Sequence, residues 1–420
     1  MIIAFFQRMI NTSFSPIYAK WSRWCLFNLL LVATAGVILR SKIIFPLEII
    51  QQKNFLHGHS HFAFSGWVSA SLMAAIISLL YPAGPGKRMS LLFRWQMIAS
   101  YGMLLTFPLM GYKLPSIFFS TITIIISYLF CYYIWKPLSI LPPSVSVWFR
   151  TALLCNLISS LGTFLLAYLM VKGSHSMELT IGSLYFFLHF QYNGWFFFSC
   201  GGLFFYFLHQ AGASWPLKTT MNIWRLLVIS VIPGYFLSAL WMKLPYWMYA
   251  LAIFAAILQL PAVFIFLKQL MTKTILPAVK PLARYCLTLC MVALFVKFIL
   301  QALSCIPTLS VYAFGYRPLV IAFLHLVLLG FVSLFILGYF LQSGLIPVNK
   351  GVKTGIYILT TGIIMNEALL MIQGLGAIGY IAIPRTNEVL WVIALIMLSG
   401  IFILNYRSAP GNYKRSSSLQ

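Results

Sequence analysis

The chain has 420 residues, of which 61% are hydrophobic and 8% are charged. A water-soluble domain needs far more charge to cover its surface, so this composition excludes a soluble protein and makes the lipid bilayer the first expected partner. The formal net charge is +24. We nevertheless expect no nucleic-acid partner, because the basic residues are scattered through short segments and not gathered on one face.

Apolar runs of about 20 residues recur along the whole chain, and no segment has the alternating pattern of a membrane β-barrel. Since backbone polar groups inside a bilayer must be hydrogen-bonded within the protein, these runs predict transmembrane helices. Twelve helices are expected, at about residues 24–41, 57–81, 94–112, 115–135, 148–171, 180–208, 222–241, 245–267, 284–304, 317–342, 353–373 and 388–406. The sequence therefore predicts an all-α integral membrane protein that forms a single membrane domain over residues 1–420.

The first and the seventh expected helices carry further signals. The segment before the first lacks a small-residue cleavage site behind a short apolar core, which indicates a retained lead-in and not a cleaved signal peptide. Pro233 and Gly234 fall inside the seventh, where they are expected to kink the helix.

The Lys and Arg residues are distributed unequally between the connecting segments. When the N-terminus is placed in the cytoplasm, most of them fall on the cytoplasmic side of a twelve-helix chain. The positive-inside rule demands such an asymmetry, and an error of one helix in the count would destroy it for the rest of the chain. We therefore expect both termini to be cytoplasmic.

One pattern, a histidine followed five residues later by glycine and then by an aromatic residue, occurs three times. It begins at His61, His189 and His325, which fall in the second, sixth and tenth expected helices. This spacing indicates an internal repeat of four helices, with approximate bounds of 24–135, 148–267 and 284–406. All three of these helices are expected to run from outside to inside. The second and third histidines then lie roughly 12–14 Å below the outer end and the first is a little shallower, so the three can converge if the helices are neighbours.

The segments around these histidines, FLHGHSHFAFSGW, HFQYNGWFFFSCGGLFFYFL and PLVIAFLHLVLLGFVSLFILGYFL, resemble helices two, six and ten of subunit I in the haem–copper oxidase superfamily. In that family, helices two and ten supply the two axial histidines of a low-spin haem, and helix six supplies a copper ligand. The resemblance implies one b-type haem between His61 and His325, and a copper ligand at His189. It also implies a multi-pass protein of the bacterial inner membrane, a cytochrome or quinol electron donor, and accessory oxidase subunits.

The chain also departs from the family pattern. His57 competes with His61 for the axial position because it lies one turn earlier on the same helical face, whereas His59 points away from both. Phe323 stands where the family has its high-spin haem ligand. The adjacent copper histidines of helix seven are missing, since no histidine lies between His209 and His325. The usual binuclear centre therefore cannot form, although His189 with His57 or His59 rotated inward would still offer a reduced copper site.

These departures leave several functions open. A haem with two histidine ligands has no open position, so it carries electrons and does not bind oxygen. This favours electron transfer, haem-linked sensing or nitric oxide handling. An active terminal oxidase or nitric oxide reductase with altered metal ligands is the first alternative, and a transporter on an inherited scaffold is the second. In the simplest interpretation of the histidines, those of HGHSH face water at the membrane surface and His325 makes a packing hydrogen bond.

Two charged residues, Lys297 and Glu367, fall inside expected helices at a similar depth. A lone charge at that depth costs about 3 kcal/mol or more, so a buried ion pair between them is expected. Two other roles remain open for Lys297, because its ammonium group could extend to the membrane surface or hold a haem propionate.

Overall fold

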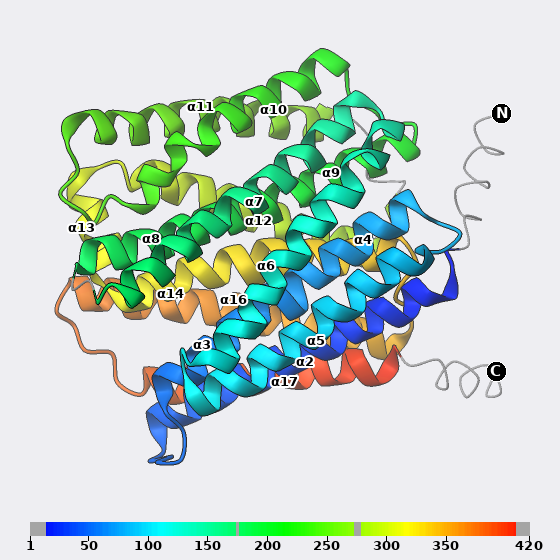
Figure 1. Cartoon of the computed structure of the whole chain (residues 1–420). Helices are drawn as coiled ribbons and strands as arrows, with labels where there is room; N and C mark the ends of the chain where they lie inside the picture. Colours follow the sequence, from blue (N-terminus) through cyan, green and yellow to red (C-terminus); the bar gives the residue numbers. More distant parts are fainter. Residues whose placement is uncertain (1–13, 174–175, 273–278, 409–420) are drawn as a thin grey trace. The chain divides into compact units, whose positions relative to one another are not determined.

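The computed structural model describes residues 14–173, 176–272 and 279–408. These residues form helices and turns without any strand (Figure 1). Nine helical segments among them are long and apolar enough to cross a membrane. The prediction of an all-α, multi-pass membrane protein is confirmed at this level, whereas the count of twelve spans and the cytoplasmic termini stay predictions. Most of the predicted lead-in, at residues 1–13, lies outside the described residues.

Each of the nine segments coincides with one of the twelve expected helices. They are Pro16–Ile44, Gln52–Leu80, Leu114–Ile140, Pro143–Val171, Tyr246–Met271, Pro281–Leu303, Arg317–Gln342, Lys350–Ile378 and Thr386–Arg407. The other three expected helices are also helical. They correspond to α5 (Gly86–Met110), to α8 with η3 and α9 (Met177–His189, Phe190–Phe196, Phe197–Gln210), and to α10 (Leu217–Val231).

Pro233 interrupts the seventh expected helix. The α-helix α10 ends at Val231 after 15 residues, and a 3-10 helix, η4 (Pro233–Ser238), follows it. Proline has no N–H to donate and its ring clashes with the preceding turn, so it kinks or breaks a helix. The expected distortion at Pro233 is therefore present, as a break and not as a kink.

The helices belong to two compact units, and each is described by itself. Among the described residues, the first contains residues 127–173, 176–272, 279 and 287–335, and the second contains residues 14–126, 280–286 and 336–408. In the second unit, α2 (Pro16–Ile44) packs against α17 (Thr386–Arg407), and α17 packs against α16 (Lys350–Ile378). The helices α3 (Gln52–Phe62) and α5 also pack together there.

Two glycines bring α16 and α17 into backbone contact. A Cβ atom on Gly355 would lie 2.8 Å from the carbonyl oxygen of Gly400, and one on Gly400 would lie 2.7 Å from the backbone nitrogen of Leu359. Small residues allow such close approach between helices in a bilayer, where packing and not water exclusion drives association.

In the first unit, α7 (Pro143–Val171) packs against α8, η3 and α9, and α10 packs against α11 (Tyr246–Thr272). The remaining helices of this unit are the greater part of α12 (Pro281–Leu303), α13 (Pro307–Gly315) and α14 (Arg317–His325). A π-helical segment, η6 (Leu326–Ser333), joins α14 to α15 (Leu334–Gln342). The segments η3 and η6 contact each other in this unit.

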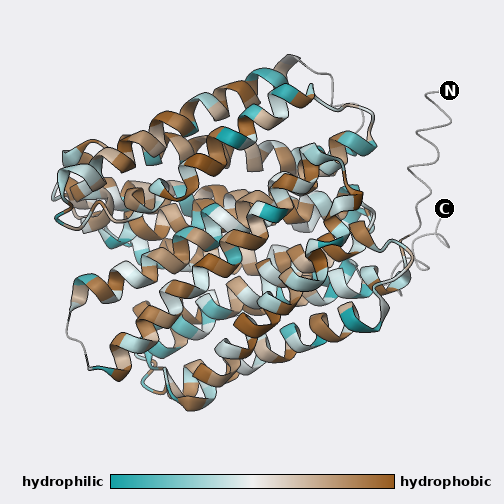
Figure 2. Cartoon of the chain, turned by 45° about the horizontal axis from the view of Figure 1, so that its top comes forward, coloured by the Kyte–Doolittle hydropathy of each residue, from teal (hydrophilic) through white to brown (hydrophobic). Residues whose placement is uncertain are grey.

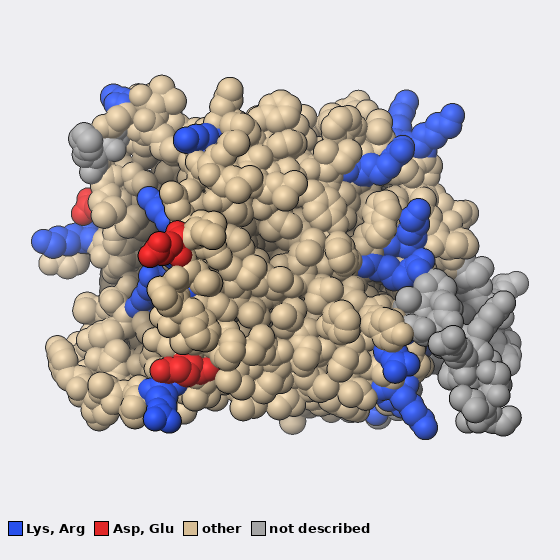
Figure 3. All heavy atoms as spheres, turned by 90° about the horizontal axis from the view of Figure 1, so that it is seen from below, with Lys and Arg blue, Asp and Glu red and all other residues tan. Residues whose placement is uncertain are grey.

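The surface chemistry agrees with a bilayer as solvent. Large apolar side chains are exposed along the helices, among them Leu109, Leu161, Phe264 and Ile364. Hydrophobic residues extend over most of the helix lengths (Figure 2). On the face drawn in Figure 3, Lys and Arg side chains lie mostly toward the left and right sides of the view, and few Asp and Glu side chains are visible. Apolar side chains toward solvent are stable only where that solvent is lipid.

Candidate functional site

A π-helical segment follows the histidine in each copy of the repeated pattern. The segment η1 (Ala63–Ser69) begins two residues after His61, η3 begins directly after His189, and η6 begins directly after His325. Such segments are rare and occur frequently at functional sites. The sequence repeat therefore has a structural counterpart, because all three histidines lie at the entrance to the same local distortion.

The glycine of the pattern packs closely against neighbouring side chains, which leave no room for a Cβ atom. A Cβ atom on Gly194 would lie 2.4 Å from Cβ of Cys155 in α7, and a Cβ atom on Gly66 would lie 2.6 Å from the Phe62 ring. The contact at Gly194 involves an atom next to the backbone, which cannot move aside easily. Only glycine fits at this position.

Buried amide side chains donate hydrogen bonds to backbone carbonyl oxygens of η1. Asn28 of α2 donates from Nδ2 to the carbonyl oxygen of Gly66 (2.5 Å) and accepts at Oδ1 from the hydroxyl of Tyr101 (2.6 Å). Gln96 of α5 donates from Nε2 to the carbonyl oxygen of Ser65 (3.0 Å). A π turn changes the partners of backbone carbonyls, and inside a bilayer those groups must find a donor within the protein.

The segment η3 carries polar side chains that bond to its neighbours. Gln191 donates from Nε2 to Oδ1 of Asn156 (2.9 Å) and to Oγ of Ser159 (2.8 Å), both in α7. The hydroxyl of Tyr192 lies 3.4 Å from that of Ser238. These groups anchor η3 between two other elements of its unit.

His189 uses both ring nitrogens within its unit. Its Nε2 lies 2.7 Å from the carbonyl oxygen of Val231 and must donate to it, while Nδ1 accepts from the side-chain amide of Asn193 (3.1 Å). The N–H of Tyr235 would bond to Val231 in a continuous helix, but it donates to Ile232 instead (3.1 Å). His189 thus supplies a donor to the carbonyl that the break at Pro233 leaves without its helical partner.

The histidines of α3 face two different surfaces. His57 and His61 both contact Tyr112, as expected for residues one turn apart: the hydroxyl of Tyr112 lies 3.0 Å from Nε2 of His61, and its ring centre lies 4.7 Å from that of His57. The His61 ring also stacks on Phe107 at 4.4 Å. His59 points toward α2, where Cε1 lies 3.5 Å from a Cβ built on Gly36. All three side chains are half-buried, so they do not simply face water.

Two imidazole nitrogens of α3 are buried without a hydrogen-bond partner in the part of the chain that the structure describes. They are Nε2 of His57 and Nδ1 of His59. Buried polar atoms are nearly always paired, so each such atom calls for an explanation. Because His61 is bonded to Tyr112 at Nε2, His57 is the histidine of this face with an unpaired nitrogen.

His325 is the last residue of α14 and is oriented by its own helix. Its Nδ1 lies 3.0 Å from the carbonyl oxygen of Ile321, one turn earlier, and must donate to it. The lone pair of the ring is therefore on Nε2. A histidine that ligates a metal commonly has this arrangement, in which one nitrogen is held by a carbonyl and the other coordinates.

The predicted site residues are divided between the units. His57, His59 and His61 belong to the second unit, and His189 and His325 belong to the first. Within the first unit, the rings of Tyr192 and Phe323 lie 6.3 Å apart, and those of Phe197 and Phe331 lie 6.0 Å apart. Among the described residues, no three or more His, Cys, Asp or Glu side chains form a group that could hold a metal ion. The haem pair and the copper site stay predictions.

Lys297 and Glu367 also lie in different units, so their ion pair stays a prediction. Lys297 is only 2% exposed, and its Nζ stands 4.1 Å from the ring centre of Phe298 and 5.6 Å from that of Phe197. Its side chain is therefore buried against these rings. Glu367 accepts a hydrogen bond at Oε1 from Asn366 (3.0 Å).

Sequence reasoning did not find the residues that support the repeated segments. The missed residues are Asn28, Gln96, Tyr101, Phe107, Tyr112, Asn156 and Gln191. A usable signal existed for Asn28 and Gln96, because a side-chain amide inside an apolar run must find a partner. No known family model matches the chain, and no curated protein matches its sequence.

Proposed function

We propose that this chain is a haem protein of the bacterial inner membrane that resembles subunit I of the haem–copper oxidases. One low-spin b-type haem would be held by His325 and by a histidine of α3, either His61 or His57. The carrying observation is that the histidines of the repeated pattern each stand at the entrance to a π-helical segment. The proposed role is electron transfer, haem-linked sensing or nitric oxide handling.

The ring nitrogens of these histidines are suited to axial coordination of a haem iron. The hydrogen bond from His325 Nδ1 to Ile321 leaves its lone pair on Nε2, which is the nitrogen that would coordinate. On α3, His57 Nε2 is buried with no hydrogen-bond partner in the described segments, and a ligand would satisfy it. His61 Nε2 would first have to release Tyr112. These contacts favour His57 over His61, in contrast to the position implied by the repeated pattern.

The surrounding residues would hold the ligands in place. Phe107 stacks on His61 and fixes its ring plane, and Tyr112 contacts both candidate histidines. Asn28 and Gln96 keep η1 in its π conformation through its carbonyl oxygens. A haem with two histidine ligands supplies one-electron transfer and leaves no open position for oxygen.

His189 gives less support to this proposal. Both of its ring nitrogens have hydrogen-bond partners within the first unit, so a metal at His189 would have to displace Val231 or Asn193. This favours a cytochrome-like role over the alternative of an active oxidase or nitric oxide reductase.

The first test is a reduced-minus-oxidised spectrum of the detergent-purified full chain, recorded with and without carbon monoxide. We expect a b-type α band that carbon monoxide does not change, and we expect it to disappear in His325→Ala. The matched control is His209→Ala, because His209 lies at the end of α9, where Nδ1 is 3.5 Å from the exposed Ser214 hydroxyl. This variant should retain the band.

The variants His57→Ala and His61→Ala separate the two candidate ligands of α3. Loss of the low-spin band in only one of them identifies the ligand, with His57 expected from its unpaired nitrogen. A spectrum shifted by carbon monoxide would contradict a bis-histidine haem and support the oxidase alternative. A folded protein without any haem band, purified from cells with sufficient haem, would refute haem binding altogether.

A further inference from the structure

Two histidines of α3 lie one turn apart on the same face, and both contact the tyrosine that follows α5. The hydroxyl of Tyr112 lies 3.0 Å from Nε2 of His61. The ring of His57 meets the Tyr112 ring edge-on, with 4.7 Å between the ring centres and 70° between the planes. Nε2 of His57 is buried and has no hydrogen-bond partner among the described residues. Tyr112 therefore hydrogen-bonds to Nε2 of one histidine and packs against the ring of the other.

The hydrogen bond at His61 occupies the nitrogen that would bind a metal. If the hydroxyl of Tyr112 donates, it uses the lone pair of Nε2, and if it accepts, Nε2 carries a proton. Neither arrangement leaves an electron pair on Nε2 for coordination. His57 has no such obstacle at Nε2, because none of the described residues bonds to that atom.

Close packing of α3 against α5 holds Tyr112 beside the two histidines. A Cβ atom on Gly58 of α3 would lie 2.7 Å from the ring of Pro108 in α5. The chain turns directly after α5 at Gly111, which has a φ of +65°. A Cβ atom on Gly111 would lie 2.6 Å from Oδ1 of Asn54, also in α3. The contact between these helices is therefore too tight for Tyr112 to move away from α3 without repacking.

One phenylalanine of α5 orients the aromatic rings. Phe107 is fully buried and stacks on His61, with 4.4 Å between the ring centres and 3° between the planes. Its ring also stands edge-on to that of Tyr112, at 5.0 Å. The ring of His57 lies further from Phe107, at 6.3 Å, and is tilted by 47°. His61 is thus fixed by a stacked ring and by a hydrogen bond, whereas His57 has neither of these two constraints.

We propose that Tyr112 is a positioning residue that selects the axial ligand on α3, because its hydroxyl keeps Nε2 of His61 from coordinating and leaves His57 as the ligand. This inference rests on the proposed function, since it concerns the same haem. It goes further by making the choice of ligand depend on a single hydroxyl group. Without that hydroxyl, His61 offers the same ring nitrogen about 6 Å further along the same helical face.

Spectra of the detergent-purified full chain test this selection. In His57→Ala, the low-spin b-type band should be lost, because His61 stays bonded to Tyr112. In the double variant Tyr112→Phe/His57→Ala, the band should return through His61, and a third change, His61→Ala, should abolish it again. A double variant that stays without the band, or a band that depends on His61 in the presence of Tyr112, would overturn the selection. Wild-type protein without any band would instead refute the proposed function, and the inference would fall with it.

The hydrogen bond itself is measured by solid-state NMR of the full chain in lipid, labelled with ¹⁵N-histidine and kept reduced with dithionite. The ring-nitrogen signals report hydrogen bonding whether or not haem is bound. Tyr112→Phe should shift the signal that is missing from His61→Ala and leave unchanged the signal that is missing from His57→Ala. An unshifted His61 signal would show that the hydroxyl does not hold this nitrogen, and it would overturn the inference without bearing on the haem.

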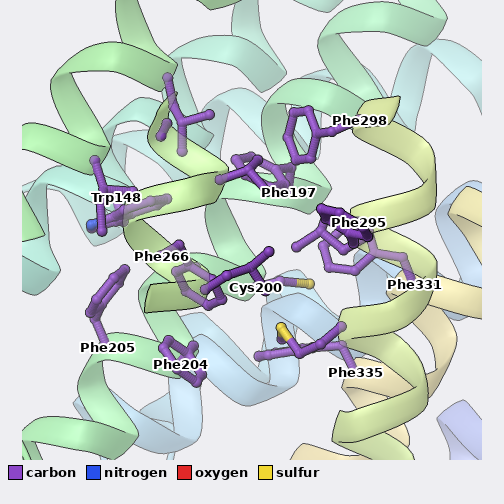
Figure 4. A pocket seen from close by; sticks show the side chains of 18 residues that line it. Trp148, Phe197, Cys200, Phe204, Phe205, Phe266, Phe295, Phe298, Phe331 and Phe335 are labelled. Carbon is purple, nitrogen blue, oxygen red and sulfur yellow. The ribbon is translucent and has the colours of Figure 1, made fainter. Parts of the chain in front are cut away.

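Two control variants separate this effect from a general loss of packing. Tyr18→Phe also removes one tyrosine hydroxyl from the second unit, where it donates to the carbonyl oxygen of Tyr81 (2.6 Å). Phe204→Ala enlarges an apolar pocket of the first unit, and no histidine is among the residues that line this pocket (Figure 4). Neither control should restore the band to His57→Ala. Restoration by either one would show that loosened packing, and not the loss of the hydroxyl beside α3, makes the second histidine available.

Discussion

At the scale of single residues, buried side chains supply hydrogen bonds to backbone carbonyl groups in the interior of this membrane protein. Asn28 is fully buried and bonds at the same time to the Gly66 carbonyl and to the Tyr101 hydroxyl. His189 serves the Val231 carbonyl in the same way in the other unit. In both cases a side-chain N–H bonds to a carbonyl oxygen in or beside a distorted helix, so these residues support η1 and the break at Pro233.

Replacing Asn28 with leucine is expected to destabilise the protein. The change leaves the Gly66 carbonyl without this donor and the Tyr101 hydroxyl without this acceptor, and each buried unsatisfied group costs about 1–3 kcal/mol. Measurements in membrane proteins give lower values, about 0.6 kcal/mol per interaction, so the expected loss is about 1–3 kcal/mol in total. The free energy of unfolding in mixed micelles measures it.

The matched control is Thr121→Leu. Thr121 is exposed on α6 (Leu114–Trp135), and its hydroxyl donates to the carbonyl oxygen of Ile117 in the same helix. This variant should unfold like the wild type. Equal stability of the Asn28 variant and this control would show that the bonds to η1 contribute nothing measurable.

At the scale of elements, the histidine–glycine–aromatic pattern marks a distorted helix and not merely a short motif. Its glycine permits close contact with a neighbouring helix, as at Gly194 and Cys155. The π turn next to it redirects carbonyl groups toward side-chain donors such as Asn28 and Gln96. Packing and hydrogen bonding therefore act together to hold each histidine at a defined place.

Gly194→Ala tests this contact. The added methyl group would lie 2.4 Å from Cβ of Cys155, and such overpacking costs about 1–3 kcal/mol. The second change Cys155→Gly removes the clashing atom and should restore part of the loss, which a double-mutant cycle of unfolding free energies measures. Gly315→Ala is the control, since a Cβ atom there would have no neighbour within 4 Å. A loss at Gly194 that Cys155→Gly does not reduce would contradict the steric explanation.

At the scale of the whole molecule, the bilayer explains the composition. Helices that are apolar around most of their circumference leave their exposed side chains in lipid, and their backbone groups are satisfied internally. The scarcity of acidic residues makes each buried charge conspicuous. With four acids in the chain, a buried lysine such as Lys297 has few candidate partners.

The predicted cytoplasmic location of the C-terminus is tested with reporter fusions in a bacterial host. Green fluorescent protein at the C-terminus should fluoresce and alkaline phosphatase at the same place should be inactive, because phosphatase folds only outside the cytoplasm. A phosphatase fusion after Arg385, in a segment expected outside, should be active. The opposite pattern at these two positions would invert the topology that the positive-inside rule predicts.

The sequence by itself determined that this is a helical membrane protein, because apolar runs of this length can satisfy their backbone only as helices in lipid. It also determined the position of the repeat, and the break at Pro233 followed from the chemistry of proline. The count of twelve helices in three groups of four and the identity of the haem ligands are predictions. They rest on the pattern of charges and on the family resemblance.

Only the tertiary structure decided the contacts between residues far apart in the chain. The Val231 carbonyl lies 42 positions after His189, and Phe197 lies far before Lys297, so no local pattern could reveal either contact. Spacing places His57 and His61 on one face, but the hydroxyl of Tyr112 bonds to Nε2 of His61, while Nε2 of His57 has no hydrogen-bond partner among the described residues. The physical reason is that helix periodicity fixes which side chains share a face, whereas the neighbouring helix determines which of them finds a partner.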